Sequence, residues 1–318
     1  MRVFVAGAAG AIGRHLLPQL VARGHEVTAS TRSPAKTGRL RELGAEPVVV
    51  DGLDAMAVGE AVARAEPEVV IHQMTALAGA NSLRQFDRTF AVTNRLRTTG
   101  TDNLLAAAAA AGARRFIAQS YTGWTNAREG DLVKTEDDPL DPSPPAAQRQ
   151  SLDAIAYLER VVPASPSMEG IVLRYGPFYG PGASDELVAM IRRRKLPIVG
   201  RGIGIWSFVH IYDAAAATVC ALERGAPGLY NIVDDEPVAV ADWLPYLARA
   251  VGAKPPYRVP VWLGRLAAGE VGVSVMTQIR GSSNAKAKRE LGWWPAWPSW
   301  RHGFLEGLTA GAPLRAGR

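Results

Sequence analysis

The sequence predicts an α/β fold: a doubly wound parallel sheet with a smaller carboxy-terminal lobe. Two observations predict it. Short β-branched runs alternate with longer helical stretches in the first half of the chain, which is typical of parallel strands joined by crossover helices. From about Pro237 onward the chain is rich in Trp and Pro with short helical stretches, which indicates a smaller and less regular lobe.

The expected elements follow in order. The first strand, Val3–Ala6, leads through a glycine-spaced turn into a helix that ends at Gly24, a residue suited to the position after a helix. Further strands are expected at Glu26–Ser30, Pro47–Val50, Val69–Ile71, Arg115–Gln119, Gly170–Leu173 and Ser207–His210. Further helices are expected at Thr101–Ala111 and Leu152–Val162.

Composition excludes several classes of protein. The chain has 318 residues and a net charge of +6, from 36 Lys and Arg against 30 Asp and Glu. Because these basic residues are scattered, no nucleic-acid partner is expected. The single cysteine, Cys220, excludes an internal disulfide and a cysteine zinc site. Five scattered histidines without paired carboxylates predict no metal site.

The chain carries no pattern for membrane insertion or export. Its first residues enter a strand directly, without the layout of a signal peptide. The longest apolar run, around Leu104–Gly112, is dominated by alanine and is shorter than the ~20 residues that a membrane span requires. We therefore expect a soluble, cytoplasmic protein without a membrane partner.

Three glycines form the first functional pattern, because they follow a strand and open a helix. Gly7 allows a tight turn, Gly10 lets the backbone approach a pyrophosphate, and Gly13 lets the helix pack close to the strand. With Ala11 and Ile12, they place the N–H groups of a helix start where phosphates would bind. The pattern predicts a Rossmann-type dinucleotide site.

With this turn the chain resembles the short-chain dehydrogenase/reductase superfamily, and specifically its extended, epimerase/dehydratase-like branch. Similar motifs occur along nearly the whole chain, at Gly100–Leu105, Leu173–Gly182, Phe208–Asp213 and Leu291–Trp293. The resemblance implies that further residues contact the cofactor: Asp51, Gly52, Leu53, Gln73, Met74, Thr75, Gln119, Tyr175, Gly176 and Pro177.

The end of the second expected strand predicts which nicotinamide cofactor binds. An NAD-specific site places an acidic residue there, to accept hydrogen bonds from the ribose 2′-hydroxyl. No Asp or Glu occurs between Thr28 and Lys36. The guanidinium of Arg32 suits a 2′-phosphate, and Thr31 and Lys36 could add a hydroxyl group and a charge. The sequence therefore predicts NADP(H).

The catalytic pattern that the resemblance implies is broken. The family uses a tyrosine as general acid/base, a lysine four residues later, and commonly a glutamate four residues after that. With Glu159 matched to this glutamate, Ile155 takes the lysine position and Ser151 the tyrosine position. Neither can replace the family residue, and no tyrosine in the chain has a lysine four residues after it. Glu159 itself is expected as a solvated helix residue.

Another proton donor is therefore sought just beyond the fifth strand. The Ser or Thr of the family falls on Tyr121 there, directly after Ser120, and these two are the candidate catalytic residues. Tyr121 could donate a proton to a substrate carbonyl, although a phenol with a free pKa near ~10 needs an activating neighbour. The alternative interpretation is an aromatic residue in the pocket wall.

Two further departures bear on the substrate. Arg97 stands at the family's asparagine position, three residues before Gly100, and Asn94 lies one turn earlier. Ile205 and Trp206 occur where nucleotide-sugar enzymes usually carry a diphosphate-binding arginine. This loss favours an apolar, uncharged substrate.

Together these features predict an NADP(H)-dependent oxidoreductase that acts on a small, largely apolar carbonyl or activated alkene with a non-standard proton donor. The alternatives are a cofactor-retaining epimerase, dehydratase or lyase, and a non-catalytic NADP(H)-binding protein. We expect the cofactor domain to span 1–178, with 205–233 returning to it, and the substrate lobe to span 179–204 and 234–318. The resemblance also suggests a homodimer.

Overall fold

The computed structural model describes residues 1–77 and 83–309. At its centre lies a parallel sheet with the strand order β12-β7-β5-β4-β1-β2-β3. The strands of this sheet are β1 (Arg2–Ala6), β2 (Glu26–Thr31), β3 (Glu46–Val49), β4 (Val69–His72), β5 (Arg115–Tyr121), β7 (Glu169–Tyr175) and β12 (Gly228–Ile232). The predicted doubly wound parallel fold is thereby confirmed.

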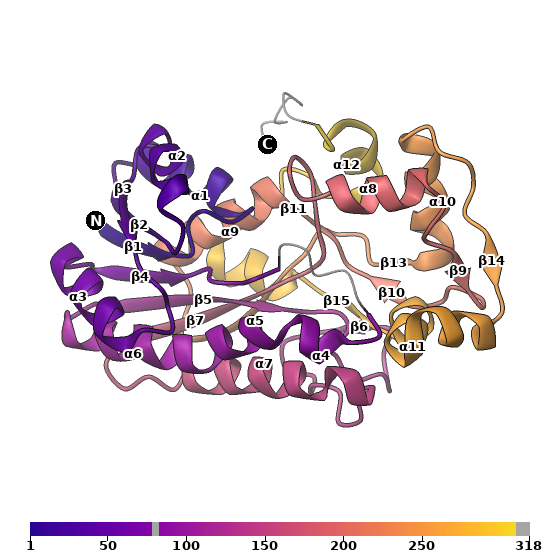
Figure 1. The fold of residues 1–318 in the computed structure, drawn as a ribbon, viewed down its shortest axis with the longest axis horizontal. Coiled ribbons are helices and arrows are strands. Elements are labelled where there is room, and N and C mark those ends of the chain that lie inside the picture. Colours follow the sequence, from indigo (N-terminus) through magenta and orange to yellow (C-terminus); the bar gives the residue numbers. More distant parts are fainter. Residues whose placement is uncertain (78–82, 310–318) are drawn as a thin grey trace.

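Helices cover both faces of this sheet (Figure 1). The helices are α1 (Gly13–Ala22), α2 (Thr37–Glu42), α3 (Ala55–Ala65), α4 (Phe86–Thr89), α5 (Ala91–Arg97), α6 (Thr99–Ala110), α7 (Arg149–Val161) and α9 (Ile211–Glu223). Strand residues alternate between the two faces: Val3 and Val5 pack with α1 and α9, whereas Phe4 and Ala6 pack with α3 and α6.

The strand order locates the crevice of the fold. β1 lies between β2 and β4, and the chain winds outward from it in both directions. In open α/β sheets ligands bind outside the carboxyl ends of the strands, at the point where the winding direction changes. That point lies between the ends of β1 and β4, at Ala6 and His72.

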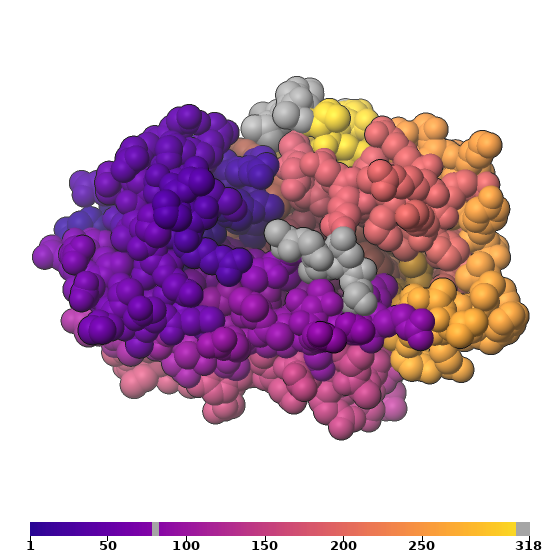
Figure 2. All heavy atoms as spheres, viewed as in Figure 1, coloured from indigo at the N-terminus to yellow at the C-terminus, as the bar shows by residue number. Residues whose placement is uncertain are grey.

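A second lobe follows beyond β7, at the right of Figure 1. It contains α8 (Asp185–Arg192), α10 (Val240–Ala250), α11 (Val261–Thr277), α12 (Trp300–Glu306) and the short strands β9 (Ile198–Val199), β10 (Ile205–Trp206), β13 (Val238–Ala239) and β14 (Arg258–Val259). An aromatic core that includes Trp243, Trp297 and Trp300 holds it together. In the space-filling view the amino-terminal part (indigo) lies opposite this lobe (salmon to orange) (Figure 2).

Short strand pairs connect the two parts of the molecule. β8 (Phe178–Tyr179) pairs with β11 (Val209–His210), directly before α9. β6 (Val133–Lys134) pairs with β15 (Gly281–Ser282), so the loop after β5 contacts a segment near the carboxyl terminus. Among the described residues, no helix has both the length and the apolar character needed to cross a bilayer.

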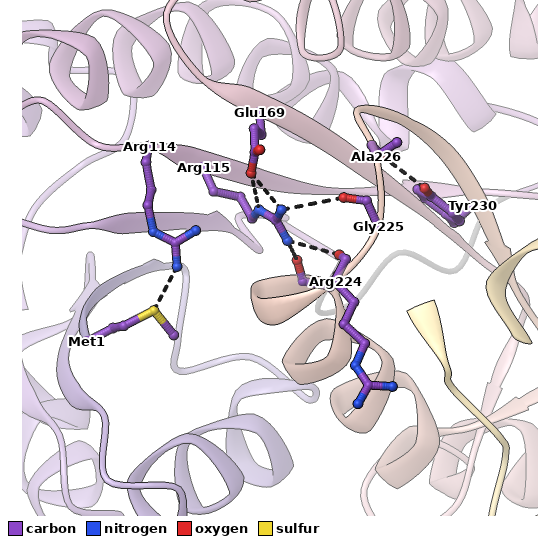
Figure 3. A network of polar contacts seen from close by, with 9 residues as sticks. Met1, Arg114, Arg115, Glu169, Arg224, Gly225, Ala226 and Tyr230 are labelled. Atoms are coloured by element: carbon purple, nitrogen blue, oxygen red, sulfur yellow. Dashed lines mark hydrogen bonds and ion pairs between the residues drawn. The ribbon is translucent and has the colours of Figure 1, made fainter. Parts of the chain in front are cut away.

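The amino-terminal edge of the sheet is fastened by Arg115, at the start of β5 (Figure 3). Its guanidinium donates to Glu169 Oε2 at 2.6 and 2.9 Å. It also donates to the carbonyl oxygens of Ala221 at 2.8 Å, Arg224 at 2.9 Å and Gly225 at 3.4 Å. This buried arginine therefore joins β5, β7 and the end of α9.

Candidate active site at the carboxyl edge of the sheet

The glycine turn joins the first strand to the first helix at close quarters. Gly7 has a φ of +79°, and a Cβ there would lie 2.7 Å from the Cα of Met74. A Cβ on Gly13 would lie 1.7 Å from the carbonyl oxygen of Ala8. Both positions therefore require glycine, the first between β1 and β4 and the second between α1 and its turn.

Gly10 differs from these two glycines, because a side chain at this position would extend into open space and contact almost no protein atoms. A Cβ there would have only the Gly7 oxygen, at 3.5 Å, within ordinary contact distance. Ala11 is also exposed, and Ile12 precedes α1 without capping it through a side chain. The backbone N–H groups at the start of α1 can therefore face an anion, and the turn fits the pyrophosphate of a dinucleotide.

The end of β2 lies next to this turn. The Ser30 hydroxyl accepts a hydrogen bond from the Gly7 N–H at 3.2 Å. Thr31 is buried and its hydroxyl accepts from the Ser33 N–H. Arg32 and Lys36 are exposed, and neither side chain bonds to another part of the described chain. Two basic side chains are thus free where the ribose 2′-position of a dinucleotide is expected.

The turn after β3 packs against the segment after β4. A Cβ on Gly52 would lie 2.2 Å from the Met74 sulfur, so a larger residue there would require the Met74 side chain to move. Asn103 on α6 donates to the Gly52 carbonyl at 3.1 Å, and Asp51 accepts from the Leu53 N–H at 3.0 Å. The structure therefore brings the turn at Asp51, Gly52 and Leu53, which is predicted to contact the cofactor, to the same edge as the glycine turn.

Gln73 and Tyr175 connect this edge to the core. The Gln73 amide donates to the Tyr175 hydroxyl at 3.3 Å, while its buried Oε1 has no partner in the described part of the chain. The Tyr175 ring is buried, its hydroxyl also bonds Thr218 at 2.7 Å, and burial raises its pKa to about 12. The Tyr175 hydroxyl therefore forms its hydrogen bonds within the core. Gln73 Oε1 has no partner among the described residues and is available to a ligand.

The remaining predicted cofactor residues lie along the same carboxyl edge. Thr75 follows Met74 and is half-buried, as is Gln119 on β5. Gly176 packs so closely that a Cβ would lie 2.0 Å from the Ser207 oxygen. The Pro177 carbonyl accepts from Val209 N–H at 3.1 Å. Their contact with a cofactor stays a prediction.

Ser151, at the predicted tyrosine position, is fully buried and hydrogen-bonded. Its backbone N–H and its hydroxyl both donate to Asp87 Oδ1, at 2.8 and 2.6 Å. Its oxygen accepts from the Asn94 amide at 3.0 Å. Ile155, one turn later on α7, is also fully buried. The match of these two positions to the family's pair stays a prediction, but neither side chain offers an acid at neutral pH.

Glu159 is not the solvated helix residue that the sequence suggested. It is 8% exposed and forms a bidentate ion pair with the buried Arg174, at 2.8 and 2.6 Å. The Ser120 hydroxyl also donates to Glu159, at 2.7 Å. The expectation was wrong because the helical pattern alone did not reveal an arginine facing it from β7. As a catalytic residue, Ser120 stays a prediction.

Tyr121 ends β5 and is half-buried, and its hydroxyl has no hydrogen-bond partner in the described part of the chain. Burial raises its pKa above the usual value, and the nearby charge of Arg97 opposes that shift. Its ring lies 6.1 Å from Trp124, which in turn lies edge-on to Phe86 at 5.1 Å. Phe86 stacks on Phe90 at 4.2 Å. Tyr121 thus stands at an aromatic wall.

The sequence indicated Arg97 only as a departure from the family pattern, and it did not predict that this arginine is buried at the site. It ends α5, is 8% exposed, and its buried Nη1 has no partner among the described residues. Burial lowers its pKa to about 10, against the opposing influence of Glu159 and Tyr121, so it remains charged at neutral pH. A basic residue on a buried helix face is the signal that could have identified it.

His72 is a buried, hydrogen-bonded core histidine. Its Nδ1 accepts from the Met74 N–H at 3.2 Å, so its Nε2 carries the hydrogen and donates to the Leu96 carbonyl at 3.1 Å. His210 repeats the arrangement with Tyr212 N–H and Gly307 oxygen. Burial lowers the pKa of each ring to about 4, so neither is a base at this edge.

Comparisons with known proteins agree with this geometry. Residues 3–233 match the NAD dependent epimerase/dehydratase family, and the chain belongs to that family. It is 44% identical over 310 residues to a 3-diazoavenalumate denitrifying reductase from a Streptomyces species, covering 96% of this chain and 99% of the relative.

Two further proteins are more distant. A ketoreductase from Stigmatella aurantiaca that acts on 4-hydroxy-2-methyl-3-oxo-4-farnesyl-3,4-dihydroquinoline-1-oxide is 29% identical over 296 residues, covering 91% of this chain and 85% of the relative. The UDP-glucose 4-epimerase of Thermus thermophilus, solved with NAD, superposes with a TM-score of 0.73 at 26% identity and covers 97% of each chain.

Proposed function

We propose that the protein is an NADP(H)-dependent reductase whose reaction proceeds without the family's tyrosine–lysine pair. One observation carries the proposal. The open space at Gly10 and the close approaches at Gly7 and Gly13 support pyrophosphate binding at this turn, whereas the predicted tyrosine and lysine positions hold the buried Ser151 and Ile155. A reductase relative at 44% identity supports the same reaction class.

Residues of the carboxyl edge would hold the cofactor. The start of α1 and the open space at Gly10 would take the pyrophosphate. The exposed Arg32 and Lys36, next to Thr31, would bind a 2′-phosphate and so favour NADP(H) over NAD(H). When bound, NADPH supplies a hydride that converts an aromatic diazonium, Ar–N₂⁺, to Ar–H with release of N₂ and NADP⁺.

An aromatic diazo compound is the substrate class that this site suits best. The reduction needs no net proton, and the described residues near β5 offer only a poor acid. Tyr121 has a pKa that burial raises, and Ser151 donates its hydroxyl hydrogen to Asp87. The name of the 44% identical relative points to the same substrate class. Tyr121 and the aromatic wall would then position the ring.

The second candidate is a small, largely apolar carbonyl or activated alkene, supported by the ketoreductase relative. That reaction consumes a proton, and Tyr121 would supply it, because its hydroxyl lacks a partner among the described residues at the aromatic wall. The two candidates therefore differ in what Tyr121 does.

The test measures NADPH oxidation and N₂ release with an aromatic diazo acid, and NADPH oxidation with an aromatic aldehyde and an enone. We expect one N₂ for each NADP⁺, and Tyr121→Phe should retain this rate within about threefold. If a carbonyl is the true substrate, Tyr121→Phe should instead lose about 10²–10⁴-fold, the contribution of a general acid.

Gly10→Val is the matched control, because its side chain would enter the open space at the turn and leave the core unchanged. It should weaken NADPH binding more than tenfold and remove the enzymatic part of both reactions. Tight NADPH binding by the wild type without oxidation of any of these compounds would contradict the proposal and indicate a non-catalytic binding protein. Substrate conversion without net NADP⁺ would indicate an epimerase or lyase.

A further inference from the structure

Arg97 is a buried cation that no residue of the described chain pairs. It is 8% exposed, its Nη1 is inaccessible to water, and its side chain forms none of the hydrogen bonds or ion pairs among these residues. Burying an unpaired charge is costly, so natural proteins keep such groups paired with an opposite charge or with a ligand. The unpaired guanidinium therefore points to a binding partner outside the chain.

Glu159 is the carboxylate whose charge acts on Arg97, but it does not neutralise this guanidinium. Both carboxylate oxygens of Glu159 accept hydrogen bonds from Arg174, and one of them also accepts from the Ser120 hydroxyl. Glu159 and Arg174 cancel each other, so the charge of Arg97 remains uncompensated in this buried group. One further negative charge would complete the balance.

The surroundings of Arg97 limit what can carry that charge. Tyr121 lies within electrostatic reach of Arg97 and has a hydroxyl without a partner in the described part of the chain. Next to Tyr121 stands Trp124, followed by Phe86 and Phe90. A flat, apolar ring matches this wall, and an oxygen anion on the ring or its side chain matches the guanidinium.

We propose that Arg97 binds an anionic oxygen, a carboxylate or a phenolate, of the aromatic substrate and thereby selects it. That this ligand is the substrate rests on the proposed function, but the binding of the anion does not. The pyrophosphate of a dinucleotide belongs to the glycine turn at the end of β1, and the nicotinamide end carries no negative charge. Arg97 therefore recognises the reaction partner of the cofactor.

The proposal replaces the uncharged substrate that the sequence suggested with a substrate that carries one anionic group. The replacement of a diphosphate-binding arginine by Ile205 and Trp206 still predicts the absence of a nucleotide diphosphate. A single buried cation on α5 adds one anion-binding point to an otherwise apolar site. The expected ligand is thus an aromatic acid or phenol.

Calorimetric titration of the NADPH-loaded protein tests this without turnover. Cinnamate and the neutral cinnamamide form one pair of probes. At pH 8.5, 4-nitrophenolate and the neutral 4-nitroanisole form the other. We expect the wild type to bind the anion of at least one pair tenfold or more tightly than its neutral partner. The pair that shows the preference identifies the anion as carboxylate or phenolate.

The variants assign the preference to a residue. Arg97→Gln should abolish it, and Arg97→Lys, which keeps the charge, should retain part of it. Arg95→Gln is the matched control, because Arg95 is an exposed residue of the same helix and should leave the preference unchanged. Thermal unfolding checks that each variant folds, and we expect Arg97→Gln to fold because it removes a buried unpaired charge.

The proposal would be overturned by no preference in the wild type, by a preference that survives Arg97→Gln, or by a loss of preference in Arg280→Gln alone. Arg280 is the relevant rival, because its Nε is also buried without a partner among the described residues and it lines a separate cavity of about 670 Å³. A parallel loss of NADPH affinity in Arg97→Gln would also overturn it, since Arg97 would then bind the cofactor. Failure of the reductase assay leaves these titrations interpretable, so the two failures are distinguishable.

Discussion

A buried arginine lies at each end of the strands of the central sheet, and the two differ in their hydrogen bonding. At the amino edge, Arg115 donates to Glu169 and to three main-chain carbonyl oxygens (Figure 3). At the carboxyl edge, Arg97 has an equally buried side chain and no such partner among the described residues. The first arginine fastens the fold, whereas the second leaves its hydrogen-bonding capacity for a ligand. The division agrees with the general placement of ligands at the carboxyl ends of parallel strands.

The largest effect on stability is expected at the amino edge. Arg115→Met should lower the free energy of unfolding by about 3–5 kcal/mol, because it leaves buried carbonyl oxygens and the Glu169 carboxylate without their donor. Urea denaturation measures it. Arg114→Met is the matched control, since this exposed neighbour should change stability by less than about 0.5 kcal/mol. Equal effects in the two variants would show that the hydrogen bonds of Arg115 do not stabilise the fold.

The buried histidines predict a loss of stability in acid. His72 has a pKa of about 4 in the folded protein against 6.5 in the unfolded chain. The contribution of neutral His72 to the free energy of unfolding is therefore fully present above pH 6.5 and is lost as the pH falls toward 4. At 1.36 kcal/mol per pH unit, this loss amounts to about 3 kcal/mol for this ring. Denaturation at pH 7 and pH 5 measures the slope. His72→Gln should flatten it in part, because His210 contributes in the same sense; an unchanged slope would show that His72 does not titrate in this range.

Cofactor choice gives the next effect, this time at the carboxyl edge. Arg32→Ala should weaken NADPH binding by roughly 1.5–3 kcal/mol, the range for a hydrogen bond to a charged group, and leave NADH binding almost unchanged. Fluorescence titration with both cofactors measures the two affinities. Arg39→Ala is the control, because Arg39 is exposed but pairs with Glu42. If both cofactors weaken equally, Arg32 has a structural role only.

Only a small effect on stability is expected for Arg97, and this prediction sharpens the comparison with Arg115. Arg97→Met removes a buried charge that has no partner among the described residues, so the free energy of unfolding without ligand should stay within about 1 kcal/mol of the wild type or rise. Urea denaturation of Arg97→Met beside Arg115→Met makes the contrast direct. A loss of several kcal/mol in Arg97→Met would mean that the guanidinium stabilises the fold after all.

The sequence predicted those features that depend on local pattern. β-branched runs indicated the strands β1, β2, β4, β5 and β7, and the spacing of Gly7, Gly10 and Gly13 indicated the turn between β1 and α1. The structure adds why two of these glycines are required, since a Cβ at Gly7 or Gly13 would overlap backbone atoms. Such close approaches follow from the strand–turn–helix geometry itself, so a short stretch of sequence contains the signal.

The features that the sequence did not predict depend on contacts between distant elements. Glu159 is buried because Arg174 faces it from β7, 15 residues away. Arg97 is unpaired within the described chain because this carboxylate is already occupied, a fact that requires α5, α7 and β7 to be seen together. A charged residue on a helix is normally solvated, and only tertiary packing reverses that expectation.

The central claim is that hydride leaves the cofactor without a tyrosine–lysine pair on α7. Single-turnover oxidation of bound NADPH by Ser151→Ala, with an aromatic diazo acid in excess, tests it most directly. We expect a rate within about threefold of the wild type, because the Ser151 hydroxyl only joins Asp87 and Asn94. A loss of about 10²-fold or more, as expected for removal of a general acid, would contradict it.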